Sequence, residues 1–293
     1  MAKNKGDGAR PSPFDVVEVR LAMIKLIASD LDDTLLDRDG RISRENKEVI
    51  REAVARGIVF TIVTGRMFQS AVPFAQELGF GAEHPIICYN GAVIKRVSGE
   101  TLYEDLLTPE LARAVAEYGR QRGWTVNAYY DDELYVAEID PWAEYYAAQA
   151  KVGITAVGDL VEFIEDGPKG LAKILIPGPP EDSRDRVAEL RNLLGAQVEI
   201  ACSKPEYIEI TNTNTNKGRA LLWLADFLGV RQEEILAIGD AANDVSMLKL
   251  AGVSVAVGNA APQAKEAARY ITSPSWEHGV ARAITEFALA PEQ

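Results

Sequence analysis

Apolar runs of strand length alternate with amphipathic helical patterns along this chain from Met23 onward. A glycine follows each of the first two helical patterns, at Gly57 and Gly79, where helices commonly end. This alternation favours parallel strands joined by helical crossovers, because each helix carries the chain back across the sheet. The expected elements are strands at 24–29, 58–63 and 85–89 and helices at 43–56 and 67–78.

The pattern changes after the third strand. Asn90-Gly91 is typical of a hairpin turn, and from about 108 to 205 the strands become aromatic and alternating. Asp131-Asp132 is typical of a solvated turn between two of these strands. The stretch therefore indicates an antiparallel sheet with its own helices, which we expect at 109–122, 141–150 and 181–194.

The sequence predicts an α/β fold, with a Rossmann-like parallel-sheet core interrupted by an inserted α/β domain. The core takes residues 23–107 and 206–293, and the insertion takes 108–205. Residues 1–22 are polar and aperiodic, which is typical of a flexible leader outside the fold. Because parallel strands gather their carboxyl ends at one edge, residues that follow strands on either side of the insertion should meet there.

Two carboxylates two positions apart follow the first strand, in Asp30-Leu31-Asp32-Asp33-Thr34. Phosphoryl transfer requires mainly positioning and charge neutralisation, and an Asp oxygen serves as nucleophile by forming an aspartyl phosphate. A second carboxylic acid protonates the departing alkoxide and later accepts a proton from water. We expect Asp30 to be the nucleophile and Asp32 the general acid and base, although the motif alone also fits a solvated turn.

Two other segments carry groups suited to phosphate. Thr64-Gly65-Arg66 follows the second strand, where a hydroxyl and glycine-exposed backbone hold phosphate oxygens and Arg66 reaches a substrate oxygen. Lys217 begins an apolar helical pattern, so its ammonium would face an anion at a helix N-terminus. Taken singly, Thr64 also fits a helix cap, Arg66 an internal salt bridge and Lys217 a solvated residue.

A further acidic loop follows the strand predicted at 235–238, and it reads Gly239-Asp240-Ala241-Ala242-Asn243-Asp244. Hard oxygen ligands of this kind suit Mg²⁺, which commonly takes one or two protein carboxylates together with substrate phosphate. The loop adds the carboxylates of Asp240 and Asp244 to those of Asp30 and Asp32, whose spacing lets them share one phosphoryl group and one metal ion.

The four segments, in this order and each near a predicted strand end, resemble the haloacid dehalogenase-like phosphohydrolase superfamily. The chain is most similar to its Cof-like branch of small-molecule phosphatases, because it also has Tyr89-Asn90-Gly91-Ala92, Asn216-Lys217-Gly218 and Gly279-Val280.

The resemblance implies roles for each motif residue. Asp30 would be the nucleophile, and Asp32 would be the acid and base as well as a metal ligand through its backbone carbonyl. Thr64 and Lys217 would bind the transferring phosphoryl group. In the last loop, Asp240 would ligate Mg²⁺ directly, Asp244 would act directly or through a water, and Asn243 would orient the phosphate.

The resemblance also implies that 108–205 is a cap that closes over the substrate and sets substrate choice. The chain departs from the family pattern at Asp33, where many members have Gly. Asp adopts unusual backbone angles more readily than most residues, so we expect the turn to persist.

Composition restricts the partners. The chain has 293 residues, of which 47% are apolar and 26% charged, as in ordinary globular proteins. Its net charge of −13 disfavours binding to nucleic acid or to anionic membrane surfaces. The sequence shows no apolar run of bilayer-spanning length and no secretory signal, so we expect a cytoplasmic protein. The expected partner is a small phosphorylated metabolite, and the expected assembly is a monomer or homodimer.

The predicted function is Mg²⁺-dependent hydrolysis of small phosphate monoesters, with sugar phosphates as the expected substrates and an aspartyl phosphate as intermediate. Two alternatives stay open. A phosphohexomutase would use the same motifs but return the phosphoryl group to a second hydroxyl, and a non-catalytic regulator would keep only the fold.

Overall fold

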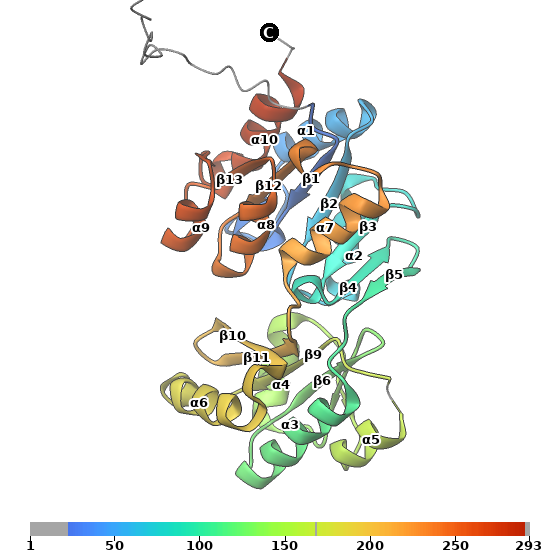
Figure 1. Cartoon of the computed structure of the whole chain (residues 1–293), viewed down its shortest axis with the longest axis vertical. Coiled ribbons are helices and arrows are strands. Elements are labelled where there is room, and N and C mark those ends of the chain that lie inside the picture. The colour runs from blue at the N-terminus through green and yellow to red at the C-terminus, as the bar shows by residue number, and fades with distance from the viewer. Residues whose placement is uncertain (1–22, 168, 291–293) are drawn as a thin grey trace, which may run out of the picture.

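The computed structural model describes residues 23–167 and 169–290, so the leader expected at 1–22 lies outside the described residues. These residues form a large lobe and a small lobe, each built on one β-sheet (Figure 1). The large lobe carries a mainly parallel sheet with helices, and the small lobe is inserted into it. The predicted fold class is therefore confirmed.

The large lobe holds an eight-stranded sheet with six parallel strands and a two-stranded antiparallel edge. In spatial order the strands are β14 (Tyr270–Ile271), β13 (Val253–Ala256), β12 (Ile235–Gly239), β1 (Leu26–Ser29), β2 (Val59–Val63), β3 (Pro85–Cys88), β4 (Val93–Arg96) and β5 (Thr101–Glu104). The helices of this lobe are α1 (Arg44–Ala55), α2 (Phe68–Leu78), α7 (Lys217–Phe227), α8 (Val245–Leu250), α9 (Pro262–Ala267) and α10 (Gly279–Ile284).

The central strand β1 pairs in parallel with β12 on one side and β2 on the other. All four of its residues are buried, as expected for an apolar strand covered by helices on both faces. The strand order runs outward in opposite directions from β1, and open α/β sheets bind ligands beyond the carboxyl ends of the strands at such a point.

The small lobe holds a six-stranded sheet that is antiparallel except for one pair, β7 with β8. Its strands in spatial order are β10 (Val198–Lys204), β11 (Tyr207–Asn212), β9 (Lys173–Pro177), β6 (Asn127–Tyr130), β7 (Glu133–Val136) and β8 (Thr155–Ala156). Its helices are α3 (Pro109–Arg122), α4 (Pro141–Ala150), α5 (Leu160–Asp166) and α6 (Ser183–Leu194). The sequence patterns did not predict β8 or α5. Because β11 belongs to this sheet, the domain boundary expected at 205 falls inside the hairpin of β10 and β11.

The two faces of the small sheet differ in chemistry. One face contributes apolar residues such as Ala128, Ile174 and Ile210 to a cluster shared with α3, α5 and α6. The register places Tyr129 opposite Lys173 and Leu175 opposite Glu209 on the other face. That second face, which carries charge, is turned toward the large lobe.

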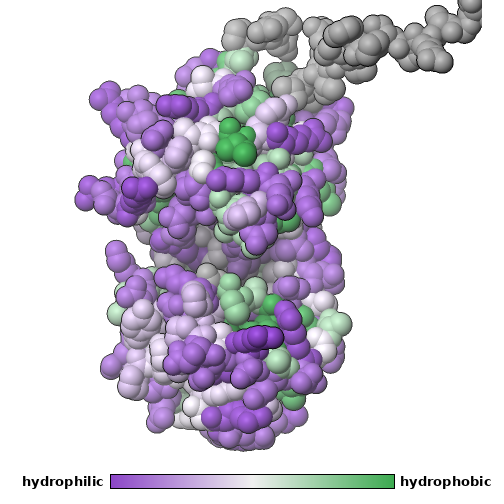
Figure 2. Space-filling model, turned by 90° about the vertical axis from the view of Figure 1, so that its left-hand side faces the viewer, coloured by the Kyte–Doolittle hydropathy of each residue, from purple (hydrophilic) through white to green (hydrophobic). Residues whose placement is uncertain are grey.

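The chain crosses between the lobes twice, once after β5 and once before α7 (Figure 1). Asp105 joins the two crossings, since its carboxylate accepts hydrogen bonds from Asn212 Nδ2 at 2.6 Å and Thr215 Oγ1 at 2.8 Å. Figure 2 shows hydrophilic side chains over most of the visible face of both lobes. Among the described residues, no helix has both the length and the apolar character that a membrane span requires.

Candidate active site

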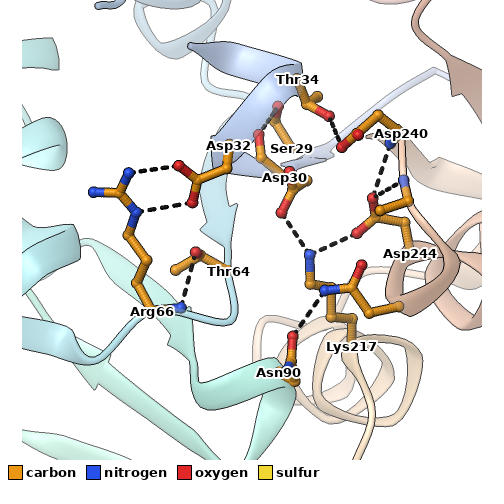
Figure 3. Close-up of polar contacts among 12 residues, drawn as sticks. Ser29, Asp30, Asp32, Thr34, Thr64, Arg66, Asn90, Lys217, Asp240 and Asp244 are labelled. Carbon is orange, nitrogen blue, oxygen red and sulfur yellow. Dashed lines mark hydrogen bonds and ion pairs between the residues drawn. The ribbon is translucent and has the colours of Figure 1, made fainter. Parts of the chain in front are cut away.

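The predicted site residues lie at the carboxyl edge of the large sheet (Figure 3). Asp30 follows β1, Thr64 follows β2 and Asp240 follows β12, while Lys217 is the first residue of α7. The segments on either side of the inserted lobe therefore meet, as the parallel pattern predicted.

Lys217 lies between two buried carboxylates. Its Nζ is 2.5 Å from Asp30 Oδ1 and 2.6 Å from Asp244 Oδ1. Lys217 is 1% exposed, Asp30 6% and Asp244 0%, so these charges are held away from water and depend on each other.

Two local features place Lys217 there. Asn216 caps the helix, because its side chain accepts a hydrogen bond from Arg219 N at 2.9 Å. Gly218 lets α7 approach α8 closely, since a Cβ at that position would lie 2.6 Å from the Ser246 carbonyl oxygen.

Three carboxylates, those of Asp30, Asp240 and Asp244, offer oxygens that all lie within 4.8 Å of one another. Thr34 Oγ1 donates to Asp240 Oδ1 at 2.8 Å. Burial raises the pKa of Asp30 well above its usual value and outweighs the attraction of Lys217. Burial, followed by the charge of Asp244, raises the pKa of Asp240 to about 6. When all three carboxylates are ionised, the cluster holds more negative charge than the one ammonium of Lys217 neutralises.

This donor set fits a divalent cation. All three groups offer hard carboxylate oxygens, which Mg²⁺ prefers, and a cation would offset the excess negative charge. Both carboxylate oxygens of Asp244 already have partners. Oδ1 contacts Lys217, and Oδ2 accepts from the backbone nitrogens of Asp240 at 2.8 Å and Ala241 at 2.9 Å. Asp30 and Asp240 are therefore the more available metal ligands, and Asp244 orients the loop that follows β12.

Asp32 lies apart from this cluster. Its side chain is exposed and forms a two-bond salt bridge with Arg66, at 2.8 Å from Nε to Oδ2 and 2.5 Å from Nη2 to Oδ1. Of the two readings of Arg66, the internal salt bridge is the one present in this structure. The Asp32 carboxylate is not among the three grouped carboxylates, so the metal role expected of it would fall to its backbone carbonyl.

The remaining predicted residues make polar contacts within and between the loops at the strand ends. Thr64 Oγ1 accepts from Arg66 N at 3.1 Å, and Asn243 Nδ2 donates to Asn90 Oδ1 at 3.0 Å. Gly65 lies against Asn90, because a Cβ at Gly65 would be 2.9 Å from Asn90 Oδ1. The loops after β2, β3 and β12 thus contact one another.

The turn at Asp33 persists, as expected. Asp33 has a φ of 57°, in the left-handed region that Gly and Asp tolerate best. Its carbonyl accepts a hydrogen bond from Asn259 Nδ2 at 2.7 Å, which fixes the turn against the loop after β13.

Two charged residues of the small lobe were missed by the sequence analysis. Lys173 Nζ lies 3.3 Å from Glu209 Oε2 and 3.4 Å from the Gly65 carbonyl oxygen. Glu209 Oε2 also accepts from Asn90 Nδ2 at 3.2 Å. A usable signal was present, because Lys173 begins and Glu209 interrupts a strand that is otherwise buried and mostly apolar.

Comparisons with known proteins agree with this geometry. A family model described as haloacid dehalogenase-like hydrolase matches residues 27–284. The 5-amino-6-(5-phospho-D-ribitylamino)uracil phosphatase YwtE of Bacillus subtilis (strain 168) is 31% identical over 287 residues, covering 90% of this chain and 98% of that protein. An HMP-PP phosphatase of Serratia proteamaculans (strain 568) is 32% identical over 250 residues, covering 83% of this chain and 87% of that protein. The solved structure of a haloacid dehalogenase-like hydrolase from Bacteroides thetaiotaomicron has a TM-score of 0.81 and 33% identity, covering 90% of this chain and 99% of that one.

The fold and the site define a phosphate-ester hydrolase of the α/β class with an inserted cap. The chain belongs to the haloacid dehalogenase-like hydrolase family. The predicted family and enzyme class, a phosphoric monoester hydrolase, are confirmed, and the alternative of a non-catalytic regulator is not retained. From here the small lobe is called the cap and the large lobe the core.

We predict that Lys217→Met destabilises the protein by about 3–5 kcal/mol at pH 7, because it leaves buried carboxylates without their cation. The pKa of Asp30 is raised in the folded state, so this carboxyl takes up a proton on folding. The deficit of the variant should therefore shrink as the pH falls through the folded pKa of Asp30. Denaturant unfolding in chelator-treated buffer at several pH values measures this.

The matched control is Lys25→Met. Lys25 pairs with Glu234 at 2.9 Å, but its side chain is 51% exposed, so its loss should cost less than about 1 kcal/mol. Equal destabilisation by the two substitutions would contradict the central role given to the Lys217 contacts.

Proposed function

We propose that this protein hydrolyses small phosphate monoesters in a Mg²⁺-dependent reaction, with sugar phosphates as the substrate class and an aspartyl phosphate on Asp30 as intermediate. One observation carries the proposal: Asp30 lies 2.5 Å from Lys217 Nζ and within 4.8 Å of the oxygens of Asp240 and Asp244. The groups proposed as nucleophile, phosphate-binding cation and metal ligands thus lie within reach of one another.

The proposed reaction has two steps. In the first, an Asp30 oxygen attacks the phosphorus atom and the bond to the alkoxide breaks. Asp32, which takes up a proton from solvent once Arg66 has released it, gives that proton to the alkoxide. In the second, Asp32 takes a proton from water, which attacks the phosphorus and releases Asp30 and inorganic phosphate. Lys217, Thr64 and the Gly65 backbone neutralise and orient the phosphoryl oxygens, and Asn243 contributes its amide. Mg²⁺ bound at Asp30 and Asp240 would supply further charge neutralisation.

In this scheme Arg66 controls when Asp32, the proton carrier, can reach the substrate. Both oxygens of Asp32 accept from Arg66 here, so Asp32 can reach a substrate only after Arg66 lets it go. An incoming anionic substrate offers Arg66 another partner at the same place. Substrate binding would then free Asp32 for proton transfer.

We predict that Asp30→Asn abolishes both turnover and phosphoenzyme, because it removes the nucleophile. Asp32→Asn keeps the nucleophile and should slow turnover by about 10²–10⁴-fold. With a good leaving group, which needs little protonation, Asp32→Asn should still phosphorylate Asp30 and then hydrolyse it slowly. The measurement is labelled aspartyl phosphate after acid quench, which should be stronger in Asp32→Asn than in the parent.

The parent protein and Asp30→Asn are the two controls of this experiment. Label on a residue other than Asp30, or strong labelling of Asp30→Asn, would overturn the assignment of the nucleophile.

We predict that removing divalent cations with a chelator abolishes activity and that adding Mg²⁺ restores it. The reason is that Asp30, Asp240, Asp244 and a phosphate ester gather more negative charge than Lys217 can offset. Asp240→Asn should raise the Mg²⁺ concentration that gives half-maximal activity. Full activity in excess chelator after removal of bound metal would contradict the proposed metal requirement.

The polar groups on the core-facing side of the cap sheet support the proposal that the substrates are sugar phosphates. Its charged pair, Lys173 and Glu209, is internally balanced, which suits an uncharged leaving group better than an anionic one. Within the described residues, the amide atoms of buried Asn127 and the hydroxyl of Tyr207 have no hydrogen-bond partner, and such groups match the hydroxyls of a polyol. The name of the Bacillus subtilis relative also contains a phosphorylated ribityl chain.

We predict that Glu209→Gln shifts selectivity toward doubly charged esters. The substitution preserves shape but leaves Lys173 without its nearest carboxylate, so a second anionic group on the substrate gains a partner. The ratio of kcat/KM for a hexose 1,6-bisphosphate to that for a hexose 6-phosphate should rise about tenfold. Glu199→Gln, on the exposed side of β10, is the control, and an equal ratio in parent and Glu209→Gln would place specificity elsewhere.

A further inference from the structure

The turn between β6 and β7 of the cap reaches the core. Asp131 and Asp132 form this turn, with φ angles of 47° and 62°. Asp131 is exposed, as expected for a solvated turn, but Asp132 is half-buried against the core. The expectation of a solvated turn is therefore wrong for Asp132.

The Asp132 carboxylate caps a core helix. Its Oδ1 accepts from Phe68 N at 2.7 Å and its Oδ2 accepts from Gln69 N at 2.6 Å. These are the first two amides of α2, and the residue at the N-cap position, Met67, makes no side-chain capping bond. Gln69 Nε2 also donates to the Asp132 carbonyl. The cap thus supplies the N-terminal capping group that the core sequence lacks.

The same carboxylate holds the neighbouring loop. Tyr89 OH donates to Asp132 Oδ1 at 2.8 Å. Tyr89 has a φ of 52°, which is unusual for an aromatic residue and persists only where contacts hold it. Its backbone nitrogen donates to the Arg66 carbonyl at 3.0 Å, and Asn90 N donates to the Thr64 carbonyl at 3.0 Å. Asp132 therefore contacts the N-terminus of α2, into which the loop after β2 leads, and the turn that follows β3.

We propose that Asp132 is a positioning residue that latches the closed cap onto the core and thereby holds the Thr64–Arg66 loop and the Tyr89–Asn90 turn in their phosphate-binding arrangement. When the cap swings away, α2 loses its capping group and Tyr89 loses its anchor. The order of the phosphate loop is then coupled to cap closure through one side chain that does not touch the reacting atoms. The catalytic consequence rests on the proposed function, whereas the latch itself does not.

The test compares Asp132→Gly with Asp131→Gly. Each removes one charge from the same turn, and Gly accommodates the positive φ at either position. For Asp132→Gly, hydrogen exchange of the Phe68 and Gln69 amides should accelerate about tenfold. Its KM for a hexose 6-phosphate should rise about tenfold while kcat changes less than about twofold, because a smaller fraction of the protein is in the binding-competent closed state.

Three further variants test the same contacts. Asp131→Gly should match the parent in both measurements. Asp132→Asn should fall between the parent and Asp132→Gly, because its amide keeps one acceptor oxygen where the carboxylate uses two. Tyr89→Phe weakens the latch from the core side and should raise KM about threefold, which keeps the test open if Asp132→Gly does not fold.

The outcomes separate the alternatives. Unchanged amide exchange in Asp132→Gly would mean that the latch does not exist in solution, and faster exchange with an unchanged KM would reduce Asp132 to a structural helix cap. Either result overturns the proposal. A parent protein without phosphate-ester turnover would instead refute the proposed function, and the exchange experiment would still test the latch.

Discussion

The contact of one buried ammonium with two buried carboxylates organises the rest of this structure. Lys217 meets Asp30 and Asp244 where water is excluded, and such charges are stable only when their geometry is well satisfied. To bring them together, α7 must begin at Lys217 and lie close to α8, which is why a glycine follows at position 218. The remaining imbalance, three carboxylates against one ammonium, makes this edge of the sheet attractive to a cation.

A second set of polar contacts joins the two lobes. On the cap side they come from Asp132, Lys173 and Glu209, and on the core side they reach the loops that follow β2 and β3. Apolar contacts accompany them, because Tyr129 and Leu175 of the cap lie in one buried cluster with core residues such as Tyr89, whose ring centroid is 5.8 Å from that of Tyr129. The contact between the two lobes is therefore both polar and apolar.

The sequence predicted the parts of the fold and site that follow from local pattern. Strand ends at Ser29, Val63 and Gly239 are set by apolar runs, and parallel pairing then brings their following residues together. It could not predict contacts that depend on how the lobes meet. The local sequence of Asp132 is typical of a solvated turn, and its capping role shows only in the structure, where α2 lacks a capping side chain of its own. The boundary expected at 205 divides the hairpin of β10 and β11, because the residue patterns of these two strands fit either lobe. Charges inside buried strands, Lys173 and Glu209, were the overlooked signal.

The candidate phosphate-binding groups already have partners before any ligand arrives. Lys217 is held by Asp30 and Asp244, Arg66 by Asp32, and Asn243 by Asn90. A phosphoryl group that enters this site exchanges these internal contacts for its own, so its net binding energy is a difference between two sets of charge-assisted bonds. When these two sets of bonds are nearly equal in free energy, a further cation in the site decides whether the phosphoryl group binds. In the proposed function, a bound metal ion would favour the contacts made by the phosphoryl group over the internal ones. Asp32, released from Arg66, would then be free when the reaction needs a proton carrier.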